Sequence, residues 1–118
     1  MSERIVLIYS TVPNRDEAVR IARSLVANRL CACVNIGSIQ SVYQWQGEIQ
    51  EDQEFSVLVK TTERRLTQAV NHLLSLHPYQ TPAVLWWYVD GTEVRFADWI
   101  RQQAGDSRDD CGSPSESH

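Results

Sequence analysis

The chain has 118 residues, of which 42% are apolar and 22% charged, a composition that is ordinary for one soluble globular domain. No stretch of about 18 apolar residues is present, so we expect no membrane-spanning helix and no membrane partner. The net charge is −4, but residues 104–118 hold four of the 15 acids and one of the 11 bases. The remainder therefore carries only −1 and has no basic stripe, which argues against nucleic acid as the main partner.

Cysteine content and the first residues bear on location. Three cysteines, an odd number, imply no disulfide framework. The apolar run Ile5–Tyr9 is too short for the core of a signal peptide, and no cleavage-like segment follows it. Both observations favour a reducing, cytoplasmic location.

The chain begins with a predicted strand and helix. Ile5–Tyr9 is apolar at every position, which predicts a strand buried on both faces. Asn14 is suited to cap a helix, with Glu17 at the reciprocal position of a capping box. Apolar residues then recur at helical spacing, which predicts a helix from about residue 15 to residue 29.

A long β-hairpin is predicted next. Residues 31–36 form a second strand, and beyond Gly37 the odd positions up to Ile49 are mainly apolar while the even ones are mainly polar. This period-two alternation extends over more residues than the five or six of a typical strand. We expect the chain to reverse within residues 47–52 and to continue in a third strand over residues 55–60.

The second half of the chain predicts a helix, a strand and a shorter helix. Thr61 or Thr62 can cap the second helix, which must end before Pro78. Residues 83–89 are apolar at almost every position and predict a fourth strand, and a short helix with three large apolar residues follows after a turn. The segment 104–118 is rich in Ser, Asp and Gly and is expected to be disordered.

The predicted order is β-α-β-β-α-β plus a C-terminal helix, over a domain of residues 1–103. This is an α+β class, the ferredoxin-like split β-α-β plan with an antiparallel sheet and two helices on one face. The fourth strand lies at a sheet edge in this plan, yet it carries Trp86 and Trp87, which must point to opposite faces. Leaving one indole of roughly 200 Å² in water costs several kcal/mol. We therefore expect other subunits to cover the second face; the alternative is that the C-terminal helix covers it within one chain.

Five motifs occur in order between Ile5 and about Gln103. They are Cys31-Ala32-Cys33-Val34-Asn35-Ile36, Ser41-x-Tyr43-x-Trp45-x-Gly47-x-Ile49, Lys60-Thr61, His77-Pro78-Tyr79-x-Thr81-Pro82 and Asp98-Trp99-Ile100. Together they resemble the CutA family of divalent-cation tolerance proteins. The resemblance implies a cytoplasmic homotrimer of ferredoxin-like subunits packed sheet to sheet, similar to the PII signalling proteins. It also implies a role in tolerance of copper or another divalent metal.

His77 is the first candidate metal ligand, because a neutral imidazole binds copper or zinc well. The resemblance places two further proposed copper ligands, a cysteine and a second histidine in some relatives, at Ser10 and Leu76 of this sequence. Neither residue type is a usual copper ligand. The alternative is that His77 ends the second helix and hydrogen-bonds the backbone near Pro78.

Cys31 and Cys33 are the second metal candidates. They lie two apart in the predicted strand, so both thiols are expected to point to the same face, where thiolates can hold Cu(I). The alternative is that they pack as small apolar residues in the core. No motif requires a cofactor, and copper or another divalent cation is the one that these residues suggest.

Six residues are candidates for an inter-subunit cleft or interface: Tyr43, Trp45, Lys60, Tyr79, Trp86 and Trp87. A cationic amine beside aromatic rings can bind an anion or a small metabolite. Alternatively, the rings form interface core and Lys60 pairs with Glu48 or Glu54.

The sequence carries no nucleophile-and-base motif, phosphate loop or paired carboxylates, so we do not expect an enzyme. The function expected is that of a trimeric metal-tolerance protein with weak metal binding. The alternative is a PII-like signalling or scaffold module that binds a small ligand at clefts between subunits.

Overall fold

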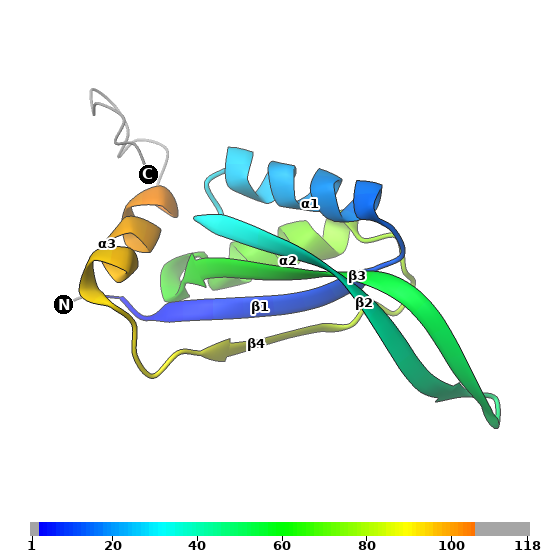
Figure 1. The fold of residues 1–118 in the computed structure, drawn as a ribbon. Coiled ribbons are helices and arrows are strands. Elements are labelled where there is room, and N and C mark those ends of the chain that lie inside the picture. Colours follow the sequence, from blue (N-terminus) through cyan, green and yellow to red (C-terminus); the bar gives the residue numbers. More distant parts are fainter. Residues whose placement is uncertain (1–2, 106–118) are drawn as a thin grey trace.

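The computed structural model describes residues 3–105 of the chain, and its elements follow the predicted order (Figure 1). They are β1 (Ile5–Val12), α1 (Arg15–Ala27), β2 (Cys33–Trp45), β3 (Glu48–Thr62), the 3-10 turn η1 (Glu63–Arg65), α2 (Leu66–Leu76), β4 (Val84–Tyr88) and α3 (Val94–Gln103). No helix within residues 3–105 has both the length and the apolar character needed to cross a membrane.

The four strands form one antiparallel sheet in the order β2-β3-β1-β4. Both α1 and α2 pack on the same face, here called the helix face, and the opposite side is the open face (Figure 1). The main core lies between the sheet and these helices. Its fully buried members include, from the strands, Ile8, Val12, Val57 and Val59 and, from the helices, Ile21, Leu25 and Leu73. The ferredoxin-like α+β architecture is thus confirmed.

The helix starts show one confirmed cap and one corrected cap. The Asn14 side chain accepts a hydrogen bond from the Glu17 backbone N–H at 2.9 Å, as expected for the start of α1. At the second helix, Thr62 occupies the N-cap position of η1 but makes no capping hydrogen bond through its side chain. Thr61 instead donates its hydroxyl proton to the carbonyl of Leu30 at 2.7 Å. The α-helix therefore begins after a 3-10 turn, at Leu66.

The β2–β3 hairpin turns at Gln46 and Gly47, whose φ angles are 52° and 83°. Two consecutive residues with positive φ form the type I′ turn that suits a two-residue hairpin. Gly47 thus lies in the turn as expected, but the reversal does not extend to residue 52, because β3 already begins at Glu48.

The end of the hairpin extends beyond the rest of the sheet. The last pair between β1 and β3 joins Val12 to Phe55, so within the described part of the chain the β2 and β3 residues of the segment 39–54 pair only with each other. We call residues 39–54 the arm. It projects from the body of the subunit (Figure 1), and the molecule is accordingly elongated, with extents of 55 × 28 × 24 Å.

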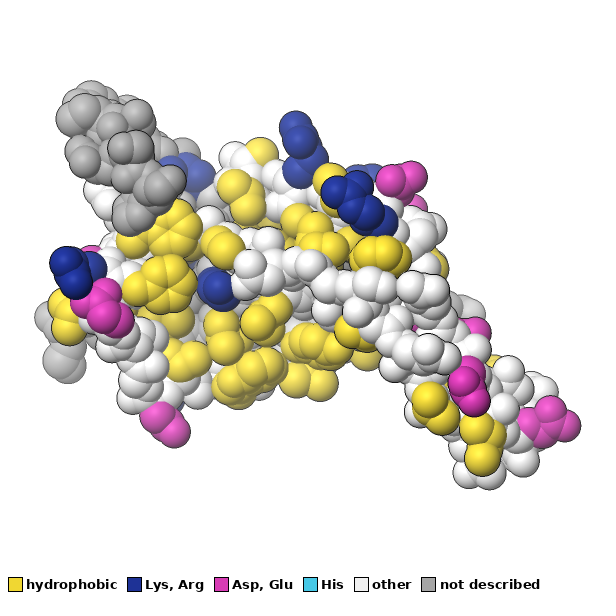
Figure 2. Space-filling view, in the orientation of Figure 1, with side chains coloured by type: hydrophobic (Ala, Val, Ile, Leu, Met, Phe, Trp, Pro, Cys, Tyr) yellow, Lys and Arg dark blue, Asp and Glu magenta, His cyan; other side chains and the backbone are white. Residues whose placement is uncertain are grey.

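The open face is only partly covered. At one end, Ala97 and Ile100 of α3 pack on Ile5 and Ala32 in a second, smaller apolar cluster. Elsewhere hydrophobic side chains gather over the sheet between α3 and the arm (Figure 2). The C-terminal helix therefore covers part of this face, and the alternative that it covers the whole face is wrong. Of the segment 104–118, only Ala104 and Gly105 lie within the described residues, and both are buried.

Candidate functional site

His77 follows α2 directly, and both nitrogens of its ring make hydrogen bonds. Nδ1 accepts from the backbone N–H of Tyr79 at 3.1 Å. Nε2 lies 2.9 Å from the carbonyl oxygen of Thr11 and 3.1 Å from the hydroxyl oxygen of Ser10. Because Nδ1 is an acceptor, the proton of the neutral ring must sit on Nε2 and be donated toward β1. Burial lowers the pKa of His77 below its ordinary 6.5, which favours this neutral form.

This arrangement is not a preformed metal site. A metal can reach a ring nitrogen of His77 only by displacing one of its hydrogen bonds. The Ser10 hydroxyl is fully buried beside the ring, and Leu76 packs against the main core. Within residues 3–105, no three His, Cys, Asp or Glu side chains come together as a metal could require. The three aligned positions therefore do not supply the donors of a tight copper centre.

The two cysteines do not share a face, and this expectation was wrong. Cys31 belongs to the main core under the helices, whereas Cys33 packs with the cluster beneath α3. The reason is that β2 begins only at Cys33, so the period of two does not apply across residue 31. Burial, aided by the nearby Cys33 thiol, raises the pKa of Cys31 to about 12, which keeps it a neutral thiol at neutral pH.

Tyr79 links the loop after α2 to the arm. Its hydroxyl donates to Oε2 of Glu54 at 2.7 Å, while the Ser41 hydroxyl donates to Oε1 of the same carboxylate at 2.6 Å. A second hydrogen-bonded pair joins Tyr43 of β2 to Asp52, which lies two residues before Glu54 in β3. Burial first, and the hydrogen bond to Glu54 second, raise the pKa of Tyr79 to about 12. The base of the arm thus carries a polar cluster of two tyrosines and two carboxylates.

The other cleft candidates lie apart from this cluster. Trp45 sits at the tip of the arm, opposite Glu48, and is 61% exposed. Lys60 lies on the open face opposite Leu7, with its Nζ 5.6 Å from the centre of the Phe96 ring. Neither Glu48 nor Glu54 pairs with it, and no ion pair to Lys60 exists among residues 3–105. A single subunit therefore does not bring Lys60 and Trp45 together with Tyr79.

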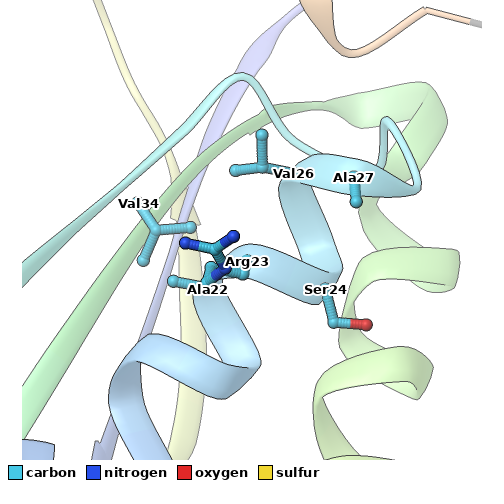
Figure 3. A pocket seen from close by; sticks show the side chains of 6 residues that line it. All are labelled: Ala22, Arg23, Ser24, Val26, Ala27 and Val34. Atoms are coloured by element: carbon cyan, nitrogen blue, oxygen red, sulfur yellow. The ribbon is translucent and has the colours of Figure 1, made fainter. Parts of the chain in front are cut away.

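Two surface pockets were not predicted. One is an open, mainly apolar groove between α1 and β2 that is lined by Ala22, Arg23, Ser24, Val26, Ala27 and Val34. Figure 3 shows Val34 of β2 beside the α1 side chains. The other has about 200 Å³ and is lined by Arg4 and Arg101 together with the turn after β4. The one sequence signal for the groove is Val26, an apolar residue off the buried stripe of α1.

Comparison with known proteins decides the family. Residues 6–103 match the family described as CutA1 divalent ion tolerance protein. This chain belongs to the CutA1 family. The divalent-cation tolerance protein CutA of Thermotoga maritima is 40% identical over 98 residues, which cover 83% of this chain and 97% of the relative. The protein of the same name from Thermus thermophilus is 41% identical over 104 residues, 87% of this chain and 99% of the relative.

Solved CutA1 structures share the fold. The crystal structure of the divalent ion tolerance protein CutA1 from Ehrlichia chaffeensis superposes with a TM-score of 0.85 at 35% identity, covering 89% of this chain and 99% of that one. CutA from Xylella fastidiosa gives a TM-score of 0.82 at 35% identity, with 86% and 99% covered. The resemblance read from the CutA1 motifs is confirmed, and so is the fold that it implied.

Proposed function

We propose that this CutA1 chain acts in divalent-cation tolerance, as a cytoplasmic homotrimer that binds rather than catalyses. The observation that carries the proposal is the family match over residues 6–103, nearly all of the described chain. The relatives from Thermotoga maritima and Thermus thermophilus bear the name divalent-cation tolerance protein and are matched over almost their entire length.

The uncovered sheet supports assembly. Leu85 and Trp87 lie on the open face and are 51% and 43% exposed, and Ile49 near the arm tip is 74% exposed. Apolar side chains of this size lose several kcal/mol of stabilisation when they stay in water. Packing of subunits sheet to sheet, with the arm of each reaching a neighbour, would remove these surfaces from solvent.

Metal binding in this proposal is weak and uses His77. The ring is neutral near pH 7, as a ligand must be, but each nitrogen already has a hydrogen-bond partner. A bond to copper or another divalent cation therefore costs one hydrogen bond, which lowers the net affinity. Cys31 is not a better donor, since its raised pKa opposes the thiolate that a metal requires.

The state of the nucleophile-and-base pair at His77 supports the proposal that this site is not catalytic. The Ser10 hydroxyl oxygen lies 3.1 Å from Nε2 of His77, the distance of a serine–histidine couple. Nε2 carries the proton that it donates to Thr11, however, so it has no lone pair with which to accept the serine proton. Ser10 is also fully buried, so no substrate reaches it.

A second function is favoured by the polar cluster at the base of the arm. Tyr43, Asp52, Glu54 and Tyr79 lie near the uncovered sheet, and Lys60 presents a charge there without an acidic partner among the described residues. When subunits enclose this face, such groups can line a cleft for a small polar ligand, as in a PII-like signalling or scaffold module.

Three measurements test the proposal. Light scattering on the purified protein should give about three times the chain mass of 13.5 kDa. Titration calorimetry with copper(II) or zinc chloride should show weak binding that His77→Ala reduces and that His72→Ala leaves unchanged, because the half-buried ring of His72 contacts Ser24 of α1 rather than His77. Expression in a bacterial host that lacks its own CutA1 protein should raise the copper concentration that halves growth. A monomer at micromolar concentration rejects the assembly, and unchanged growth rejects the tolerance role.

A further inference from the structure

Among the residues that the structure describes, no third strand supports the arm. Beyond the Val12–Phe55 pair, residues 39–45 pair with residues 48–54 in a two-stranded ribbon. An isolated two-stranded hairpin is only marginally stable in water and twists readily. The direction of the arm relative to the sheet must therefore be fixed by contacts at its base.

Small changes of direction at that base are amplified at the tip. Seven residue pairs at about 3.3 Å per residue make the arm about 23 Å long. A tilt of about 10° at the base displaces the tip by about 4 Å, which is as large as an apolar contact distance. The tip carries Trp45 and Ile49, two of the most exposed apolar side chains in the subunit. These two side chains can contact a second copy of the chain at a defined place only if the arm keeps one direction.

One side-chain hydrogen bond joins the arm to an element outside its own hairpin within residues 3–105. It runs from the Tyr79 hydroxyl to Glu54, the first arm residue of β3 beyond the last pair with β1. The other side-chain hydrogen bonds of the arm stay within the hairpin, including Ser41 to Glu54 and Gln40 to Glu51. A carboxylate acceptor makes the Tyr79 bond stronger than a bond between neutral groups.

Tyr79 is itself held in place by His77. Its backbone N–H donates to Nδ1 of His77, and the two rings lie 5.1 Å apart. The other nitrogen of His77 is tied to the Thr11 carbonyl near the end of β1. An unbroken series of contacts thus runs from β1 through His77 and Tyr79 to Glu54. Both ends of this series belong to the sheet, one in its body and one in the arm.

We propose that Tyr79 is a latch that fixes the direction of the arm through Glu54, and that His77 is a positioning residue for Tyr79. The latch presents Trp45 and Ile49 in the direction that a second copy of this chain requires. The latch explains why both ring nitrogens of His77 make hydrogen bonds within the protein. A histidine dedicated to metal binding would keep one nitrogen for the metal.

The test compares Tyr79→Phe with Tyr88→Phe. The first change removes only the hydroxyl that reaches Glu54, and the second removes a hydroxyl that lies 3.4 Å from Glu63, away from the arm. In Tyr79→Phe we expect amide hydrogen exchange within residues 39–54 to rise roughly three- to tenfold, or subunit dissociation to accelerate by a similar factor where partners cover the arm. Tyr88→Phe should leave both at the wild-type level.

Two further results bear on the proposal. His77→Gln removes the ring that accepts from Tyr79, and we expect arm exchange to rise in it as well, although by less than in Tyr79→Phe. Arm exchange and dissociation that both match wild type in Tyr79→Phe overturn the latch, as does an equal change in Tyr88→Phe. The subunit-dissociation readout rests on the proposed trimer, whereas the exchange readout does not. A protein found to be monomeric therefore rejects the assembly while still testing the latch.

Discussion

Trp86 and Trp87 are neighbours in β4, yet their indoles lie on opposite faces of the sheet. Trp86 is paired with Ile8, which faces the helices, and Trp87 is paired with Leu7 on the open face. The two side chains remain 47% and 43% exposed, so the isolated subunit shields neither of them. Only Trp87 lies on the side where packing of subunits sheet to sheet would cover it.

The first prediction uses this pair as its own control. In Trp87→Ala we expect subunit association to weaken by about 2 kcal/mol per contact, because roughly 100 Å² of apolar surface no longer becomes buried. Trp86→Ala should weaken association much less, since its indole lies on the helix side. Sedimentation at several concentrations measures both. Equal weakening in the two variants would place the interface elsewhere.

The second prediction concerns the arm tip. Trp45→Ala should raise the concentration at which the assembly dissociates and leave helix content unchanged, because the residue is 61% exposed and sits at the far end of the hairpin. Leu74→Ala, which removes a side chain of 44% exposure on the helix side, should leave assembly intact. Light scattering and far-UV circular dichroism separate the two effects. An unchanged mass in Trp45→Ala would deny the tip a role in the interface.

The third prediction is a pH dependence caused by His77. Its folded pKa lies below 6.5, so the unfolded chain binds the proton more readily. The stabilisation from the neutral ring is complete above pH 6.5 and is lost as the pH falls through the lower folded pKa. Protonated Nδ1 can no longer accept from the Tyr79 N–H, which is the structural cause.

Thermal unfolding between pH 8 and pH 5 measures this effect. The midpoint of the wild-type protein should fall over the acid part of the range more steeply than that of His77→Gln, whose amide keeps a donor and does not titrate. Parallel curves for the two proteins would show that the His77 ring contributes nothing to the acid sensitivity.

The fold was predictable because local patterns and the global plan agree. The apolar run of β1, the helical stripe of α1 and the alternation in β2 each determine one element, and their order leaves few topologies. Boundaries were less certain. The sequence pattern places Cys31 in a strand that begins two residues later, and it extends the hairpin reversal to Asp52, although β3 already begins at Glu48.

The site was less predictable because its contacts are remote in sequence. The sequence pattern around His77 indicated either a metal ligand or a residue that ends a helix. Both interpretations depend on residues that are adjacent to it in the sequence. Its partners Ser10 and Thr11 lie 67 and 66 residues away and come close only because the loop after α2 passes the end of β1. The Tyr79–Glu54 bond has the same origin. Sequence patterns place residues on elements, but such pairings depend on how the elements pack.

The fourth prediction concerns the hairpin turn. Gln46 has a φ of 52°, a left-handed conformation that costs a residue with a long side chain about 1 kcal/mol. Asn tolerates this conformation, and Asn-Gly is the preferred pair for a type I′ turn. We therefore expect Gln46→Asn to raise the free energy of unfolding by roughly 0.5–1 kcal/mol, as measured by urea denaturation.

Gln44→Asn is the matched control, because Gln44 pairs with Ile49 in extended conformation, where asparagine is disfavoured. A gain in stability at position 44, or none at position 46, would show that the turn conformation is not what limits the arm.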